Sequence, residues 1–292
     1  MCGIFAVTPY TERLRQAIPT FAIAIENRGK DSWGATDGTQ IHKCLGKITD
    51  NFEYFSDWER LLLHTRQATT GEKTVENSHP FECFGTNPNT LAVKKIIGVH
   101  NGVVTNDSEL NQKYSRNCSV DSEHIFQHLA EGRSLEDVEA HGPIVWIEDD
   151  SELLNFAILR RGDLHIAKLL GGEFVLCSYE YPIDTSARMF RWGVPTFFKI
   201  ESNHRYYIKE GSCYKGAEIE VGESETQYAG WLSLRSHSTT WERCYSCNTK
   251  YVEGKKLVCS DCFLGLTTIE DDAILPESVF VRSNGPSAQV RL

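Results

Sequence analysis

The sequence lacks the segments that would anchor the chain in a membrane or direct its export. Its longest early apolar run is Phe21-Ala22-Ile23-Ala24-Ile25, which is far shorter than the roughly 18 residues needed to span a bilayer. The amino-terminal residues lack the charged and apolar regions of a secretory signal peptide. We therefore expect a cytoplasmic protein that does not associate with membranes.

Positive charge is also scarce. The chain of 292 residues carries 30 Lys and Arg against 40 Asp and Glu, a formal net charge of −10. A surface of this charge repels nucleic acid and anionic lipid at long range, so neither is an expected partner. The 40% of hydrophobic residues is ordinary for a globular protein and sufficient for a sizeable core.

Cysteine, in contrast, is plentiful, with ten residues. Thiols stay reduced in the cytoplasm, so packing, metal ligation and catalysis are the roles to consider. For five of the ten, packing in the core is the expected role. These five are Cys44, Cys83, Cys118, Cys177 and Cys213.

Strand-like and helix-like stretches alternate along the chain as far as about residue 220. The simplest architecture is a layered α+β domain, with sheets packed face to face and helices outside. One expected helix has Pro19 in its first turn, a second has Asp121 as its N-cap, and a third begins at Ser134 in a Ser-Leu-Glu-Asp capping box. Strands are predicted at 2–7, 61–63, 95–99, 155–159, 164–167 and 174–177, with Arg161-Gly162-Asp163 as a turn.

The composition changes after Gly222. Sequence rich in Ser and Thr leads there into a cysteine cluster and then into an acidic tail. We therefore predict one domain over 2–222 and a second region over 223–292.

Cys2 follows the initiator methionine directly. Removal of Met1 would give Cys2 a free α-amine, whose pKa of about 7.7–8.0 suits it to accept the thiol proton and to pass it to a leaving group. Taken alone, a cysteine here is better explained as a small apolar residue on a buried strand. The other motifs of the chain decide between these interpretations.

Six motifs occur in a fixed order. They are Met1-Cys2-Gly3-Ile4-Phe5, Asn27-Arg28-Gly29-Lys30-Asp31-Ser32-Trp33-Gly34, His64-Thr65-Arg66-Gln67-Ala68-Thr69-Thr70-Gly71, Asn77-Ser78-His79-Pro80-Phe81, Val99-His100-Asn101-Gly102 and Asp121-Ser122-Glu123. Together they resemble the glutaminase domain of class II glutamine amidotransferases, which are N-terminal nucleophile hydrolases. The resemblance covers about residues 2–215 and implies a four-layer αββα sandwich.

The resemblance implies that Cys2 attacks the side-chain amide of L-glutamine and forms a γ-glutamyl thioester, releasing ammonia. It implies that the side chain of Asn101 and the backbone N–H of Gly102 form the oxyanion hole. Two fixed donors at this place would stabilise the developing negative charge. Outside this resemblance, Asn101-Gly102 would be explained as an ordinary hairpin turn.

The same resemblance assigns the substrate-binding residues. It implies that Arg66 binds the α-carboxylate of glutamine, that Asp121 pairs with the α-ammonium group and that Arg28 supports the region of Cys2. Each residue has a plainer explanation, an exposed ion pair for the arginines and a helix cap for the aspartate. The family pattern is broken at Gln67, where many members have a Trp that helps to close the site. Pocket-lining positions fall on Thr69, Thr70 and His79.

Two Cys-x-x-Cys pairs lie near the carboxyl end. Four thiolates at this spacing are typical of a tetrahedral Zn²⁺ site, with 248–258 between the pairs as a short hairpin. A redox motif is disfavoured, because it would need only one pair, at a helix start beside a βαβ pattern, and the sequence shows no such pattern here. We predict a structural Zn²⁺ in a zinc-ribbon-like module at about 241–265, which docks a partner or secures the C-terminal region. The ligands are Cys244, Cys247, Cys259 and Cys262.

The chain beyond residue 215 leaves little room for the synthase that normally consumes the ammonia, and it holds no Gly-rich loop of the GxxxxGK type. The leading hypothesis is therefore a glutaminase subunit that hydrolyses L-glutamine to glutamate and ammonia for a separate synthase partner. A second hypothesis is a hydrolase of γ-glutamyl amides or peptides. A third is a catalytically idle, zinc-stabilised adaptor for binding.

Overall fold

The computed structural model describes residues 2–51, 55–68, 72–149 and 153–223, together with the backbone of 241–243 and 251–253. The chain divides into two compact units, Met1–Glu225 and Thr226–Leu292. Within the described residues, no helix is long and apolar enough to cross a membrane. Thr69, Thr70 and the four cysteines predicted to bind zinc lie outside the described residues.

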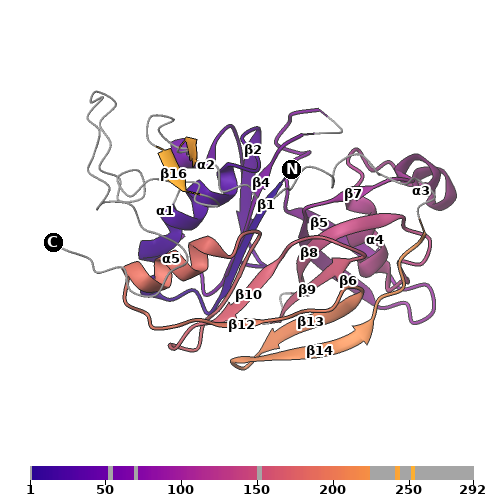
Figure 1. The fold of residues 1–292 in the computed structure, drawn as a ribbon. Coiled ribbons are helices and arrows are strands. Elements are labelled where there is room, and N and C mark those ends of the chain that lie inside the picture. The colour runs from indigo at the N-terminus through magenta and orange to yellow at the C-terminus, as the bar shows by residue number, and fades with distance from the viewer. Residues whose placement is uncertain are drawn as a thin grey trace. The chain divides into compact units, whose positions relative to one another are not determined.

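The first unit contains two antiparallel sheets (Figure 1). The first sheet has the strand order β12-β10-β11-β1-β4-β2-β3, which places the amino-terminal strand β1 at its centre. Its strands are β1 (Gly3–Thr8), β2 (Ser32–Thr36), β3 (Ile41–Leu45), β4 (Leu61–Arg66), β10 (His165–Lys168), β11 (Phe174–Cys177) and β12 (Thr196–Phe198).

The second sheet has the order β14-β13-β9-β8-β6-β5, and the short strand β7 also pairs with β8. The strand β6 ends at His100, so the motif that follows it emerges at the end of this sheet. The strands are β5 (Phe81–Thr86), β6 (Val93–His100), β7 (Val103–Val104), β8 (Ala140–Glu148), β9 (Leu154–Leu159), β13 (His204–Lys209) and β14 (Ser212–Glu218).

Helices pack against the outer faces of these sheets. The long helix α1 contacts β1 and β4 of the first sheet and the helix α5, whereas α4 contacts β5 and β6 of the second sheet. The helices are α1 (Glu12–Glu26), α2 (Ile48–Asn51), α3 (Asp107–Tyr114), α4 (Glu123–Glu131) and α5 (Tyr181–Met189).

The core consists of three hydrophobic layers. Side chains of β1 alternate between two of them, as the pleat of a strand requires. Phe5 packs on Phe21 of α1, with ring centroids 4.4 Å apart, whereas Ile4 belongs with Phe156 to the layer between the sheets. Phe126 of α4 lies in the third layer. The predicted α+β sandwich of two facing sheets is thereby confirmed for the first unit.

The prediction for the first helix was wrong about where it begins. Pro19, expected in the first turn, lies inside α1, which already begins at Glu12. A proline within a helix removes one backbone hydrogen bond. Leu14 and Ile18, both on the amino-terminal side of the proline, are fully buried in the core, and this packing stabilises the longer helix.

The helix predicted from Ser134 is also wrong, since no helix covers 134–139 in the described structure. The Ser134 hydroxyl accepts a hydrogen bond from the backbone N–H of Glu136 at 3.2 Å, which is the bond of a tight turn rather than of a capping box. Leu135 forms an isolated bridge with Val221. The side chain of Leu135 is buried in the core by this turn.

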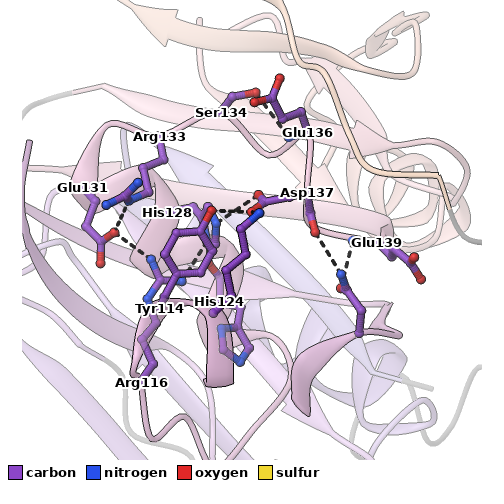
Figure 2. A network of polar contacts seen from close by, with 12 residues as sticks. Tyr114, Arg116, His124, His128, Glu131, Arg133, Ser134, Glu136, Asp137 and Glu139 are labelled. Carbon is purple, nitrogen blue, oxygen red and sulfur yellow. Dashed lines mark hydrogen bonds and ion pairs between the residues drawn. The ribbon is translucent and has the colours of Figure 1, made fainter. Parts of the chain in front are cut away.

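Polar contacts around Asp137 fix the turn against the neighbouring helices (Figure 2). The Asp137 carboxylate accepts hydrogen bonds from Lys113 Nζ at 2.8 Å and from the Tyr114 hydroxyl. Nε2 of the buried His128 on α4 lies 3.2 Å from the same carboxylate. Contacts from α3 and α4 therefore outweigh the local capping signal of the sequence.

The Arg161-Gly162-Asp163 turn does not close a hairpin. The strands on either side of it, β9 and β10, belong to different sheets. Ile158 and Ile166 both face the layer between the sheets, so each strand gains its burial in a separate sheet. Local turn residues cannot distinguish a hairpin from a connection between two packed sheets.

In the second unit, the described backbone is a pair of antiparallel strands, β15 (Trp241–Arg243) and β16 (Tyr251–Glu253). The strands flank the first Cys-x-x-Cys pair of the sequence. The expected hairpin within 248–258 is therefore offset, because its first strand precedes Cys244.

Candidate active site

The two sheets are joined by a hydrogen bond at the end where the sequence motifs gather. His64 on β4 donates from Nε2 to the backbone carbonyl of His100 on β6, at 3.1 Å. Next to this bond, the backbone N–H of Cys2 donates to Oδ1 of Asn101 at 3.2 Å. Residues 99 positions apart thus meet at the start of β1.

Cys2 is half-buried and is held on both sides of its backbone. Its carbonyl accepts a hydrogen bond from Nε of Arg28 at 2.6 Å, and the Arg28 guanidinium in turn stacks 5.0 Å from the centre of the Tyr179 ring. These two contacts are of the kind that Arg28 would need in order to support the region of Cys2, as the resemblance implies.

The thiol of Cys2 lies near two basic side chains. Burial raises its pKa above the ordinary value, whereas the charges of the N-terminus, Arg66 and Arg28 oppose this rise. The thiol is therefore mostly protonated near neutral pH and needs a base to become a nucleophile.

Asn101 and Gly102 form a tight bend after β6. The backbone N–H of Asn101 donates to the carbonyl of Pro143 at 3.0 Å, which anchors the bend to β8. A Cβ atom at position 102 would lie 1.8 Å from the His141 carbonyl oxygen, so only glycine fits. Because Oδ1 of Asn101 accepts from Cys2, the donor group of that side chain is Nδ2.

Arg66, at the end of β4, is 3% exposed although it is charged. Its Nη1 donates to the carbonyl of Glu72 at 3.2 Å. A buried guanidinium near a half-buried thiol suits the recognition of an anionic group next to the reacting bond. Arg66 is close enough to Cys2 for its charge to act on the thiol, so the two residues belong to one region of the structure.

Asp121 is also buried but does not cap α4, whose N-cap is Ser122. Its Oδ2 accepts a hydrogen bond from the backbone N–H of Val104 at 2.8 Å. The capping prediction for Asp121 is therefore wrong. The side chain instead stabilises the segment that follows Asn101-Gly102.

His100 connects this segment to the bend. Its Nε2 donates to the carbonyl of His141 at 3.1 Å, and its Nδ1 lies 2.9 Å from the Ser122 hydroxyl, from which it accepts. Burial lowers the pKa of His100 to about 4 and that of His64 to about 3. Both rings are thus neutral near pH 7, with a structural rather than a charged role.

His79 lies beside His64, and their ring centroids are 4.1 Å apart. Burial lowers the pKa of His79 well below the ordinary range. Neither ring nitrogen of His79 has a hydrogen-bond partner among the described residues. His79 therefore belongs to the apolar backing of the site through its stacking contacts with His64 and Phe81.

Asp31 is a residue of this region that the motifs contain but to which they assign no role. Its carboxylate accepts hydrogen bonds from the side chain of Gln67 at 2.8 Å and from the backbone N–H of Ala68 at 2.9 Å. An acidic residue in the same motif as Arg28 was the signal that could have identified it.

Outside this site, the cysteines follow the expected pattern in part. Cys83 and Cys177 are buried, and burial raises the pKa of each thiol to about 12. Cys44, Cys118 and Cys213 are only half-buried. Within the described part of the chain, no group of three or more His, Cys, Asp and Glu is arranged to hold a metal ion.

No protein-family model matches the chain. Curated relatives do match it, and two of them serve as examples. The chain is 34% identical over 148 residues to the amidophosphoribosyltransferase of Methanocaldococcus jannaschii, covering 44% of this chain and 29% of the relative. It is 33% identical over 132 residues to the glutamine–fructose-6-phosphate aminotransferase (isomerizing) of Encephalitozoon cuniculi, covering 38% of this chain and 18% of the relative.

Among solved structures, the glutamine phosphoribosylpyrophosphate amidotransferase of B. subtilis, complexed with ADP and GMP, superposes with a TM-score of 0.55 at 19% identity. The superposition covers 74% of this chain and 49% of that one, which shows a shared fold. The curated relatives are class II glutamine amidotransferases, enzymes that act on the glutamine amide. The matches span less than a third of the length of the two curated relatives.

Proposed function

We propose that this chain, as a relative of class II glutamine amidotransferases, hydrolyses L-glutamine to glutamate and ammonia. The observation that carries the proposal is the hydrogen bond from the backbone nitrogen of Cys2 to Asn101. Cys2 becomes the amino-terminal residue once Met1 is removed. The bond then holds it beside Asn101 and Gly102, the two residues suited to stabilise an oxyanion. A surface cysteine that merely packs on a strand would need neither this bond nor the one from Arg28.

The reaction proceeds in two halves. After removal of Met1, the free α-amine of Cys2 accepts the thiol proton while sulfur forms a bond to the amide carbon of glutamine. The C–N bond then breaks, the proton passes to the leaving nitrogen, and ammonia departs from a γ-glutamyl thioester. Water adds to the thioester with the amine as base, which releases glutamate and restores the thiol.

Asn101 and Gly102 stabilise the tetrahedral intermediates. Nδ2 of Asn101 and the backbone N–H of Gly102 donate to the oxygen on which negative charge develops. Loss of one such donor typically costs about 3 to 4 kcal/mol of transition-state stabilisation. The His141 carbonyl leaves no room for a side chain at position 102, so glycine is needed for the backbone N–H to stand there.

Arg66 and Asp121 bind the two charges of the amino-acid end of glutamine. Arg66 takes the α-carboxylate and Asp121 the α-ammonium group. A zwitterion between these residues is favoured over an internal glutamine of a protein, because a peptide has neither charge at that position. Thr69, Thr70 and His79 line the remainder of the pocket in this proposal.

The ammonia serves a separate synthase partner in our proposal. Supporting it, the matched segment makes up 44% or 38% of this chain but under a third of each curated relative. The names of those relatives describe transfer to phosphorylated sugars.

We also propose one structural Zn²⁺ held by Cys244, Cys247, Cys259 and Cys262. The support is the spacing of these cysteines together with the antiparallel pairing of β15 and β16, which puts the first two in a strand-to-strand connection. Thiolates are the ligands of structural zinc, and a closed set of four leaves no position for catalysis.

The test of the glutaminase proposal is an assay of glutamate release from L-glutamine and from γ-glutamyl peptides, compared side by side. We expect hydrolysis of glutamine and its loss in Cys2→Ala, with Cys44→Ser as the matched control. Mass spectrometry of the purified protein establishes whether Met1 has been removed. Hydrolysis by Cys2→Ala at the wild-type rate, or a strong preference for the peptides, would overturn the proposal.

A further inference from the structure

Asp31 joins two parts of the chain that flank the thiol. It directly precedes β2, and its side chain is only 15% exposed. One carboxylate oxygen, Oδ2, accepts from Nε2 of Gln67 at 2.8 Å and from the backbone N–H of Ala68 at 2.9 Å. The other, Oδ1, pairs with Nζ of Lys73 at 2.7 Å. One carboxylate thus holds residues on both sides of 69–71.

The backbone of Asp31 is fixed as firmly as its side chain. Its N–H donates to the carbonyl of Arg66 at 3.0 Å, and its carbonyl accepts from the N–H of Gly46 at 2.8 Å. Because these bonds come from β4 and from the end of β3, the position of the carboxylate is set by the first sheet. Asp31 therefore acts as a rigid reference point for whatever it binds.

Gln67 carries this constraint to the nucleophile. Its backbone carbonyl lies 3.9 Å from Sγ of Cys2, within hydrogen-bond range for sulfur. Its exposed side chain reaches away from that contact to Asp31. Both the side chain of Gln67 and the next backbone N–H are bound by one carboxylate, so the peptide between them cannot rotate freely.

We propose that Asp31 is a positioning residue that holds the backbone of Gln67 against the Cys2 thiol. The inference rests on the proposed role of Cys2 as nucleophile. The positioning role is particular to this chain, because Asp31 binds the side-chain amide of Gln67. Position 67 is where the sequence departs from the family pattern.

The same carboxylate steadies the substrate side of the site. Lys73, which is 60% exposed, follows Glu72 directly, and the Glu72 carbonyl accepts a hydrogen bond from Arg66. An ion pair this exposed contributes little stability by itself. The ion pair instead helps to position the site. It restrains Lys73, and the neighbouring Glu72 carbonyl orients the Arg66 guanidinium.

Electrostatics gives the proposal a sign that can be measured. The thiol of Cys2 donates its hydrogen bond to the Gln67 carbonyl, so this bond stabilises the protonated form of the thiol. Releasing Gln67 should therefore lower the thiol pKa. Removal of the negative charge of Asp31 would act in the same direction, because an anion nearby disfavours a thiolate. Gln67→Leu changes no charge, so a shift in this variant reports the positioning role alone.

The experiment measures alkylation of Cys2 by iodoacetamide as a function of pH, followed by mass spectrometry of the amino-terminal peptide, together with kcat and KM for glutamine. The variants are Asp31→Ala and Gln67→Leu. The matched control is Asp37→Ala, because Asp37 follows the other end of β2 and its carboxylate also accepts hydrogen bonds, from the backbone N–H groups of Thr39 at 2.8 Å and Gln40 at 2.7 Å.

We expect Asp31→Ala to move the alkylation midpoint to lower pH and to lower kcat/KM about tenfold to a hundredfold, the range typical of a misplaced reacting group. Gln67→Leu should shift the midpoint in the same direction and lower kcat more than it raises KM. Asp37→Ala should change neither. Since Gln67 is exposed, its variant tests the proposal even if Asp31→Ala fails to fold.

A Gln67→Leu midpoint that moves to higher pH, or one that stays with the control, overturns the positioning role. If the wild-type protein hydrolyses no glutamine while both variants shift the midpoint to lower pH, the proposed function fails but the tie between Asp31 and the thiol stands. The alkylation profile and the glutaminase assay thereby separate the two claims.

Discussion

Nε2 of His64 donates a hydrogen bond to the carbonyl of His100, and this bond connects the two sheets. The two residues lie on strands of different sheets, β4 and β6. Each is fully or almost fully buried. The bond thus fixes the distance between the strand that leads to Arg66 and the strand that leads to Asn101.

Replacing His64 should destabilise the protein through this bond. His64→Leu leaves the buried His100 carbonyl without its donor, which typically costs about 1 to 3 kcal/mol. We expect a loss of this size in the free energy of unfolding, measured by urea denaturation. His204→Leu is the control, because His204 is half-buried on β13 and its ring bonds only the nearby Ser202 carbonyl. Equal midpoints for the two variants would contradict the expectation.

The buried histidines also predict how stability depends on pH. His100 has a pKa of about 4 in the folded protein, against about 6.5 in an unfolded chain. The unfolded state therefore binds more protons between these values, and stability falls as the pH is lowered through this window. The contribution of His100 is fully present above pH ~6.5, and about 2 kcal/mol of it should be lost between pH 7 and pH 5.

His100→Gln tests this dependence, because glutamine retains hydrogen-bonding groups but does not titrate. Urea denaturation at pH 7 and at pH 5 gives the difference for each protein. The difference should be smaller in the variant by about 2 kcal/mol. An identical difference in the two proteins would show that His100 does not remain neutral in the fold.

Glutamine recognition by Arg66 and Asp121 predicts a change in KM. Arg66→Lys keeps the charge but loses the planar pair of donors, so KM for glutamine should rise about tenfold or more while kcat changes little. Asp121→Asn should act in the same way and should also weaken discrimination against glutamine with a blocked α-amine. Steady-state kinetics measures both effects, with Asp107→Asn on α3 as control. An unchanged KM would exclude the proposed contact.

The zinc proposal predicts one metal ion per chain. Elemental analysis of the purified protein should find about one equivalent of zinc, and Cys259→Ser should lose most of it. Cys213→Ser, a change on β14 of the first unit, serves as the control and should retain the metal. Protein purified without chelators that contains no zinc would refute the assignment.

Much of the fold was predictable because its signals are local. The buried runs of β4, β6, β9 and β11 were recognisable as strands from their apolar residues, and the layered sandwich followed from their alternation with helices. The failures have a common cause, since tertiary contacts overrode a local pattern. Pro19 is tolerated in α1 because the core continues on both sides of it, and the turn at Ser134 is held by contacts from α3 and α4.

The candidate site was predictable only through its motifs. The spacing of Cys2, Arg66 and Asn101 along the chain says nothing by itself about their distance in space. Sheet pairing brings them together, since β1 lies next to β4 and the bond between His64 and His100 attaches β6. Asp31 shows the limit of motif reading, because its three hydrogen-bond partners at positions 67, 68 and 73 are set by the path of the chain after β4.

The crowding at Gly102 restricts how the gene can vary. A single methyl group at this position would overlap the His141 carbonyl, which belongs to a backbone that cannot move aside without breaking β8 from β7. Every one-base change that alters the amino acid at a glycine codon adds at least that atom. A library of all substitutions at position 102, selected for glutamine hydrolysis, should therefore yield only glycine, and even alanine should be lost.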